Sequence, residues 1–273
     1  MGGTAKADFV LEPALLTPGG VALLCWQGTS SPQTLLKVSF DDLILPLFLR
    51  DNSPCALVGV DLDQAPGLWP LTIEAVDPSG ARQLSHLSVR IEGVEQSTQR
   101  LTLPKEMVTP TKTKIIKEIE EDSKRLDLIF SRYQPVIFSP PFQRPLAGEV
   151  ISVFGVRRVL NGLPKSPHNG IDFRATRGTA VAAMACGQVV LADDLYYTGK
   201  TVILDHGGGL FSLYAHLETL AVTPGKTVNT GQKIGTVGST GRSTGPHLHM
   251  GTRLGKARID PLALIALFAH EKR

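Results

Sequence analysis

The stretch Thr223-Pro-Gly-Lys-Thr-Val-Asn-Thr-Gly-Gln-Lys-Ile-Gly-Thr-Val-Gly238 decides the fold of the second half of the chain. A glycine stands at each expected change of direction, as tightly wound β-hairpins require, because glycine accepts positive φ without a steric cost. Short apolar segments with glycine corners recur from residue 146 onward, and the only further helix expected is the apolar tail at 261–270. The sequence therefore predicts an antiparallel, glycine-cornered β-sheet of the barrel-sandwich kind.

Working outward, the amino-terminal part is predicted to be a separate β domain. Short apolar segments follow one another from residue 9 to residue 103, bounded by turn sequences such as 51–54 and 77–80. Six or seven short strands in about 95 residues are typical of an Ig-like antiparallel β-sandwich. Pro46 and Pro70 interrupt two segments, so we expect them at sheet edges or bulges rather than in central strands. This part holds one histidine, His86, and is interpreted as a structural or binding module.

An amphipathic helix is expected between the two β domains. Residues 112–133 contain neither glycine nor proline, and their apolar residues recur at spacings near three, four and seven. That pattern is typical of one apolar helix face, which we expect to pack at the domain junction. The proline-rich residues 139–145 then predict an extended linker. The predicted domains are 1–104 (β-sandwich), 105–144 (helix and linker) and 145–273 (second β domain).

Composition excludes several classes of protein. Of the 273 residues 42% are hydrophobic, too many for a disordered chain, and no apolar run approaches the roughly 20 residues that span a bilayer. The net charge of +3 is far from a nucleic-acid-binding signature. No secretion signal is recognisable in the first 20 residues. Cys25, Cys55 and Cys186 form no C-x-x-C pair, and both a Cys25–Cys55 bridge and buried free thiols remain open.

The chemistry is predicted to lie in the second domain, where five of the seven histidines fall between residues 168 and 249. In His247-Leu-His249 the two-residue period of a strand places both imidazoles on one face. His168 precedes Asp172 by four residues, and the intervening Gly170 argues against a helix, so a turn has to bring the two together. His216 lies on another alternating segment.

Two imidazoles, one carboxylate and a water form an accepted catalytic zinc site, and zinc is the metal that suits these ligands best. The helical H-E-x-x-H motif is absent, which excludes a thermolysin-like arrangement, and no G-x-S-x-G elbow supports a serine hydrolase. His206 lies at a strand end next to turns and is interpreted as a structural hydrogen-bonding residue.

His168-x-x-x-Asp172, Tyr-Ala-His216-Leu and Ser-Thr-Gly-Pro-His247-Leu-His249 resemble the three signature motifs of the LytM/lysostaphin-type zinc metallopeptidases. The resemblance covers roughly residues 145–264 and implies the family's fold, built on a duplicated hybrid motif. It also implies one Zn²⁺ per chain held by His168, Asp172 and His249, with His216 and His247 beside the metal-bound water. Some relatives carry a tyrosine shortly before the first ligand; here that segment has Asn161 instead, a candidate substrate contact.

The function that the resemblance implies is endopeptidase cleavage of peptidoglycan cross-links outside the cytoplasm, in the periplasm, cell envelope or extracellular space. A signal or anchor segment is then expected upstream of the present Met1. The alternative is a non-catalytic regulator on the same fold that activates other cell-wall hydrolases, although such regulators lose zinc ligands and none is lost here. A lipoyl-type carrier, suggested by the hairpins at 222–232, does not need a histidine cluster. Whether the amino-terminal domain binds glycan, binds a protein partner or occludes the groove stays open.

Overall fold

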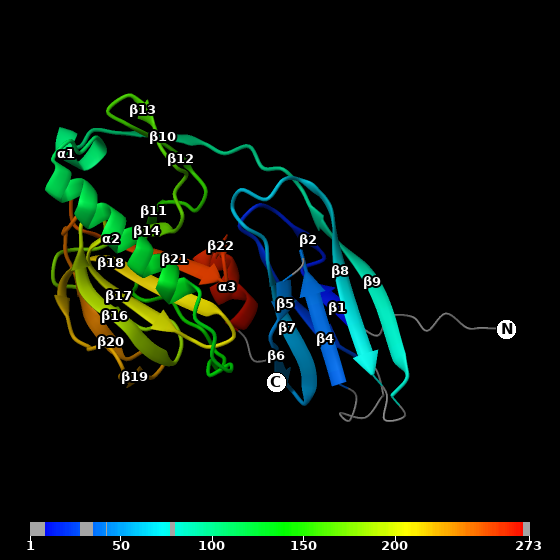
Figure 1. The fold of residues 1–273 in the computed structure, drawn as a ribbon. Helices are drawn as coiled ribbons and strands as arrows, with labels where there is room; N and C mark the ends of the chain where they lie inside the picture. Colours follow the sequence, from blue (N-terminus) through cyan, green and yellow to red (C-terminus); the bar gives the residue numbers. More distant parts are fainter. Residues whose placement is uncertain (1–8, 28–34, 42, 77–79, 270–273) are drawn as a thin grey trace. The chain divides into compact units, whose positions relative to one another are not determined.

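The structure, a computed structural model, describes residues 9–27, 35–41, 43–76 and 80–269. It is mainly β and divides into two compact units, Met1–Val94 and Glu95–Arg273 (Figure 1). Among the described residues, no helix combines the length and apolar character needed to cross a bilayer. Each unit is described below by itself.

The first unit is a sandwich of two sheets around one core. One sheet has the strand order β1-β3-β7-β6 and the other β2-β9-β8-β4-β5. Leu24 and Ala56 of the first sheet and Ile73 and Val89 of the second belong to the same buried cluster. Its strands are β1 (Phe9–Glu12), β2 (Leu15–Leu16), β3 (Val21–Trp26), β4 (Leu35–Phe40), β5 (Leu43–Leu45), β6 (Leu47–Arg50), β7 (Ser53–Gly59), β8 (Gly67–Val76) and β9 (Arg82–Ile91). The sheets are antiparallel as predicted, apart from one parallel pair, β2 with β9, and the described residues form nine strands rather than the six or seven expected.

Two predictions for this unit are corrected or resolved. Pro46 separates β5 from β6, as expected, but Pro70 lies inside β8, an inner strand. Pairing between β8 and β4 ends at Leu71, so Pro70 has a paired neighbour only in β9 and occupies a local edge where a missing N–H is tolerated. Cys25 and Cys55 lie directly opposite each other on β3 and β7 and form a disulfide, which settles the open question of their pairing.

The second unit is built on a ten-stranded sheet. Its main path runs β11-β14-β21-β18-β17-β16-β19, and β15, β20 and β22 pair alongside. A small sheet of β10, β12 and β13 accompanies it, in which β10 and β12 are parallel. The strands are β10 (Thr98–Leu101), β11 (Val150–Ser152), β12 (Arg157–Leu160), β13 (Leu163–Pro164), β14 (Ile171–Arg174), β15 (Ala180–Ala182), β16 (Gly187–Leu195), β17 (Gly199–Asp205), β18 (Leu210–Leu220), β19 (Thr227–Val228), β20 (Lys233–Val237), β21 (His247–Leu254) and β22 (Ala257–Ile259).

The glycines of residues 223–238 serve two purposes, of which the sequence analysis anticipated one. Gly225 and Gly231 have φ of 86° and 78°, and they form the turns on either side of β19. Gly235 lies inside β20, where a Cβ would collide with the β18 backbone 2.5 Å away at Thr219. Gly238, directly after β20, approaches the amide of Glu218 in the same way. Two of the four glycines therefore permit close packing of strands rather than a change of direction.

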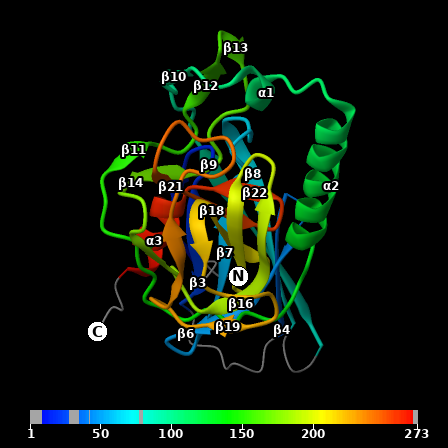
Figure 2. The same cartoon turned by 90° about the vertical axis from the view of Figure 1, so that its left-hand side faces the viewer.

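The long helix α2 (Thr113–Phe130) lies along β16 as part of the second unit (Figure 2). Its apolar face contributes Ile129 and Phe130 to a cluster with Phe211 and Ile203 of the sheet. The Phe130 and Phe211 rings meet edge to face at 5.5 Å between centroids. The other helices in the described residues are α1 (Lys105–Val108) and α3 (Pro261–Phe268). Asp260 is the N-cap of α3, and its side chain accepts a hydrogen bond from the Leu262 amide.

The proline-rich segment is bonded along its length to the same unit rather than acting as a free linker. The Ile137 amide donates to His206 O at 3.0 Å, the Phe142 amide to Phe268 O at 3.1 Å and the Gln143 amide to Met184 O at 3.0 Å. The two compact units divide between residues 94 and 95, whereas the sequence placed boundaries at 104 and 144.

Candidate metal centre

Strand pairing brings the predicted ligands together. Asp172 on β14 lies directly opposite His249 on β21. The alternation of the two strands sends Asp172, His247 and His249 to one face, while Phe173 and Leu248 point into the core with none of their surface exposed. The apolar neighbours thus fix the register, because a slip of one residue would place imidazoles in the core.

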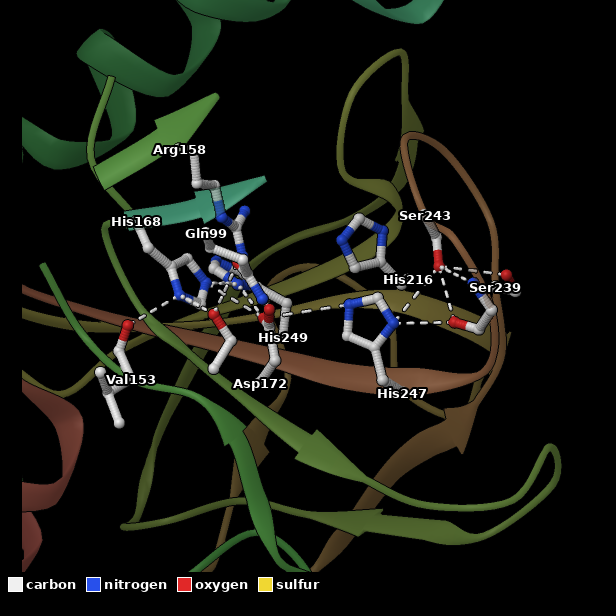
Figure 3. A network of polar contacts seen from close by, with 12 residues as sticks. Gln99, Val153, Arg158, His168, Asp172, His216, Ser239, Ser243, His247 and His249 are labelled. Carbon is white, nitrogen blue, oxygen red and sulfur yellow. Dashed lines mark hydrogen bonds and ion pairs between the residues drawn. The ribbon is translucent and has the colours of Figure 1, made fainter. Parts of the chain in front are cut away.

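Three ligand atoms form a small triangle (Figure 3). His168 Nε2 lies 3.1 Å from Asp172 Oδ1 and 2.9 Å from His249 Nδ1, and His249 Nδ1 lies 2.8 Å from Asp172 Oδ1. All three residues are buried. Atoms this close can each lie about 2.0–2.2 Å from a single ion, the range of zinc–nitrogen and zinc–oxygen bonds.

His168 is oriented by the chain that precedes it. Its Nδ1 donates to Val153 O at 3.0 Å and also lies 3.0 Å from Ser152 Oγ, which in turn is 3.2 Å from Gln99 Oε1. Because a carbonyl oxygen can only accept, the proton of His168 resides on Nδ1 and the lone pair on Nε2 faces Asp172 and His249. The His168 Nε2 lone pair thus points at Asp172 Oδ1 and His249 Nδ1, an arrangement that a cation can satisfy.

Gly170 is needed because the chain passes against His249 at this point. A Cβ at position 170 would lie 2.7 Å from His249 Cε1 and 2.9 Å from Nε2, and would collide with Met250 O. Any side chain here would displace a ligand, which explains the glycine between His168 and Asp172.

The electrostatics suit a cation. Burial lowers the pKa of His168 to about 4, so its imidazole is neutral at neutral pH. Burial acts to raise the pKa of Asp172, but the contacts of its carboxylate with the His168 and His249 imidazoles outweigh it and hold this pKa well below the usual range. Arg158 on β12 adds an ion pair of 2.7 Å to Asp172 Oδ2, which leaves Oδ1 for the cluster. The set is therefore an ionised carboxylate with two imidazoles.

Two further imidazoles stand beside this triangle. The ring centroids of His216 and His247 are 4.8 Å apart, and His216 is 6.0 Å from His249. His216 Nδ1 lies 2.8 Å from Thr240 O, and His247 Nδ1 lies 2.8 Å from Gly245 O. Both therefore keep their proton on Nδ1 and a lone pair on Nε2, and His247 Nε2 is 3.9 Å from Asp172 Oδ1. Burial lowers the pKa of His216 to about 3.

His216 occupies an unusual place in the sheet. Strand β18 pairs with β21 as far as Ala215 and with β20 from Leu217 onward, so His216 lies at the change of partner. Its φ is 59°, in the left-handed region that disfavours residues with a side chain. The irregularity turns the imidazole toward His247 instead of into the regular alternation of the strand.

An open pocket lies over the cluster. It has an empty volume of about 540 Å³, and its walls come from β10, β12, the end of β11 and the loop before β21. Asp172, His216 and His247 line its floor, and Arg158 and Arg242 line its walls together with hydroxyl and apolar side chains. A segment of substrate can thus reach the lone pairs of both histidines.

The family model described as peptidase family M23 matches residues 166–261, which contain every residue of the triangle and both adjacent histidines. The catalytic domain of lysostaphin from Staphylococcus simulans is 32% identical, and the match covers 44% of this chain and 92% of that domain with a TM-score of 0.40. The chain belongs to peptidase family M23.

The chain is also similar to a further solved structure and to a curated relative. A crystal structure from Pseudomonas aeruginosa assigned to M23 is 29% identical, with a TM-score of 0.70 and coverage of 92% of this chain and 96% of that one. The peptidoglycan DD-endopeptidase ShyA of Vibrio cholerae is 44% identical over 84 residues, which are 31% of this chain and 20% of ShyA. The chain spans about a fifth to a third of the length of the curated relatives it matches.

The structure brings together all five M23 site residues predicted from the sequence, and it places two other predicted residues elsewhere. Asn161, with φ of 51°, forms the turn after β12, and its side-chain amide bonds both backbone groups of Leu103. It is not among the residues that line the pocket. His206 is buried, with Nδ1 2.7 Å from Cys186 O and Nε2 2.7 Å from Ser212 Oγ, which agrees with the structural role predicted for it.

Sequence reasoning missed Gln99, Ser152 and Arg158, which support the ligands from outside the region that the M23 model matches. A run of two arginines shortly before the first ligand was the only local signal for Arg158. Gln99 and Ser152 carry no signal of this kind, because Gln99 reaches the site through the pairing of β10 with β12 and Ser152 through the pairing of β11 with β14.

Proposed function

We propose that the protein is a zinc-dependent endopeptidase that hydrolyses peptide cross-links of bacterial peptidoglycan. The observation that carries the proposal is the convergence of three buried ligand atoms with two imidazoles whose free Nε2 lone pairs face the same pocket. Membership of a peptidase family and similarity to relatives named as peptidoglycan endopeptidases support the reaction and the substrate.

His168, Asp172 and His249 would hold one zinc ion, which supplies Lewis acidity and a lowered pKa for bound water. Hydrolysis adds the oxygen of water to the carbonyl carbon of the scissile amide and a proton to its nitrogen. His216 and His247 are placed to handle that proton, because each presents Nε2 while a backbone carbonyl holds Nδ1–H. In its protonated form either imidazole can also donate to the carbonyl oxygen as charge builds there.

The substrate implies a location in the cell envelope or periplasm, since the cross-links lie outside the cytoplasm. Relatives named as peptidoglycan DD-endopeptidases support this assignment for the present chain. A regulator without activity is the second candidate, and the intact ligand set is the feature that favours the enzyme over it.

Mass spectrometry of the muropeptides released from purified sacculi tests the proposal. The zinc-loaded protein is expected to convert cross-linked muropeptides into the separate peptides. The His168→Ala variant is expected to produce none of these peptides above background. The masses of the new ends also identify the bond that is cut. Equal profiles from the wild type and the variant would contradict hydrolysis and favour the regulator.

A further inference from the structure

The loop between β20 and β21 holds a guanidinium at the wall of the pocket over the metal centre. The Arg242 amide donates to Tyr197 O at 2.8 Å, and the guanidinium lies over the Tyr197 ring at 4.3 Å from its centroid. Tyr197 is itself braced by the Tyr196 ring, 5.0 Å away between centroids. The Tyr196 hydroxyl donates to Glu106 O at 3.0 Å. Arg242 is thus fixed in place before any ligand arrives.

Charge on this wall is not compensated from within the protein. Asp172 is the only carboxylate among the residues that line the pocket, and it is already engaged by Arg158 and the ligand imidazoles. In the described part of the chain, Arg242 has no ion pair with a carboxylate, although its guanidinium is partly buried. Burial, with a contribution from the positive charge of Arg158, lowers the pKa of Arg242. The two guanidinium charges therefore repel each other across the pocket.

A partly buried cation without an anion is costly unless a ligand supplies the opposite charge. Guanidinium presents a planar fork of donors that matches a carboxylate, and hydrogen bonds of this kind are about twice as strong as neutral ones. Ser243 and Thr244 add hydroxyls next to Arg242 on the same wall. The lining thus favours a carboxylate over a neutral group at this point.

We propose that Arg242, with Arg158 beside it, forms a subsite for a free carboxylate of the peptide substrate adjacent to the scissile bond. The inference rests on the proposed peptidase function and adds a substrate class to it, namely cross-link peptides that carry a carboxylate next to the bond that is cut. Neutral bridges such as glycine chains would leave the subsite empty. Arg158 has a second duty to Asp172, so Arg242 is the residue through which the subsite can be tested.

The test compares two synthetic cross-linked peptides that differ only at the residue next to the scissile amide, which carries either a free carboxylate or a carboxamide. The wild-type zinc protein is expected to cleave the carboxylate peptide with kcat/KM about 10–100-fold higher, the range for a hydrogen bond to a charged group. Arg242→Gln should lower kcat/KM for the carboxylate peptide to the value for the carboxamide peptide. It should change kcat/KM for the carboxamide peptide by no more than about threefold. Arg242→Lys, which keeps the charge without the planar fork, should retain part of the preference.

Arg177→Gln is the matched control, because Arg177 pairs with Glu218 outside the pocket and should leave both rates unchanged. An equal loss on both peptides in Arg242→Gln, with zinc content intact, would show that Arg242 only braces the loop and would overturn the subsite. Equal kcat/KM values of the wild type for the two peptides would also overturn the subsite.

A binding measurement separates this inference from the proposed function. Fluorescence anisotropy of the same two labelled peptides is recorded with the zinc-loaded His247→Ala variant, with and without Arg242→Gln. If the wild type cleaves neither peptide but binding still favours the carboxylate through Arg242, the peptidase proposal fails and the subsite stands. If cleavage proceeds but neither rate nor binding depends on the carboxylate, the subsite fails and the peptidase proposal stands.

Discussion

The second unit contains two buried histidine networks that look alike in burial and differ in what their nitrogens do. His206 and His168 are both buried, and burial lowers the pKa of each to about 4. In His206 both ring nitrogens are taken up by protein partners, Cys186 O and Ser212 Oγ. In His168 one nitrogen is taken up by Val153 O, and the other faces Asp172 Oδ1 and His249 Nδ1.

The difference teaches that burial and a lowered pKa do not by themselves mark a reactive site. What distinguishes the candidate metal centre is a set of three potential ligand atoms that face one another next to a pocket. The His206 network has its donors and acceptors matched within the protein, so it can contribute to stability but offers nothing to a ligand. Four predictions test this contrast.

The largest effect is expected from removing a ligand of one network and comparing it with the other. His249→Ala should lose most of the bound zinc and at least about 10³-fold in turnover, because two remaining ligands hold the ion far more weakly. His206→Gln should keep one zinc per folded chain. Elemental analysis measures the zinc, and hydrolysis of a cross-linked muropeptide measures the turnover. Loss of zinc from His206→Gln with zinc retained in His249→Ala would contradict the assignment of the metal to His249.

At the candidate metal centre, zinc binding and catalysis should depend on different residues. His216→Ala and His247→Ala are expected to retain near-stoichiometric zinc while losing roughly 10²-fold or more in rate, as for a positioned acid, base or oxyanion donor. The same zinc and turnover measurements apply. If His247→Ala lost its zinc while His249→Ala kept both metal and activity, the roles of the two residues on β21 would be exchanged.

The His206 network should affect how the stability of the protein depends on pH. The pKa of His206 is about 4 when folded and close to 6.5 when unfolded, so the neutral form is favoured by folding. Its contribution is complete above pH 6.5 and is lost as the pH falls toward 4, by about 3 kcal/mol in the free energy of unfolding. Denaturant unfolding at several pH values should therefore show a steeper decline for the wild type than for His206→Gln. Parallel curves would mean that His206 is not the titrating group.

The smallest effect concerns the support of the metal centre. Ser152→Ala removes the hydroxyl between His168 and Gln99 but leaves the hydrogen bond from His168 to Val153 O. We expect zinc affinity to fall by about tenfold, the lower end for partners that orient a ligand. Competition with a chelator measures it, with Ser131→Ala at the end of α2 as the control. An unchanged affinity would assign the orientation of His168 to the backbone alone.

A local rule predicted that two histidines of the site share one face, whereas the choice of His168, Asp172 and His249 as ligands followed from the resemblance to LytM-type peptidases. His247 and His249 are two residues apart on a strand, so the period of two was enough to place them on one face. Arg158, by contrast, reaches Asp172 from β12, and Gln99 comes from β10, which pairs with β12 in parallel. Parallel pairing over such a distance leaves no periodic trace in a single sequence, so these supports could not be found.

The fold divides in the same way. The β content of the first unit and helix α2, expected at 112–133 and observed at Thr113–Phe130, were predicted from alternation and helical spacing, which are local signals. The bonding of residues 134–145 to the second unit was not predicted, because these residues were judged by their prolines. Their amides bond to His206, Phe268 and Met184, and such partners depend on the folded second unit. Asn161 likewise had no local sign that its side chain would be used by Leu103.

The backbone of His216 carries a consequence for protein engineering. A left-handed conformation costs a residue with a side chain on the order of 1–3 kcal/mol, and glycine would avoid most of that cost. A library selected only for heat resistance is therefore expected to accumulate glycine or asparagine at position 216, and each such substitution would remove one of the two imidazoles beside the proposed metal site. Thermostable descendants of this chain would need selection for turnover in every round, since stability and activity pull in opposite directions at this residue.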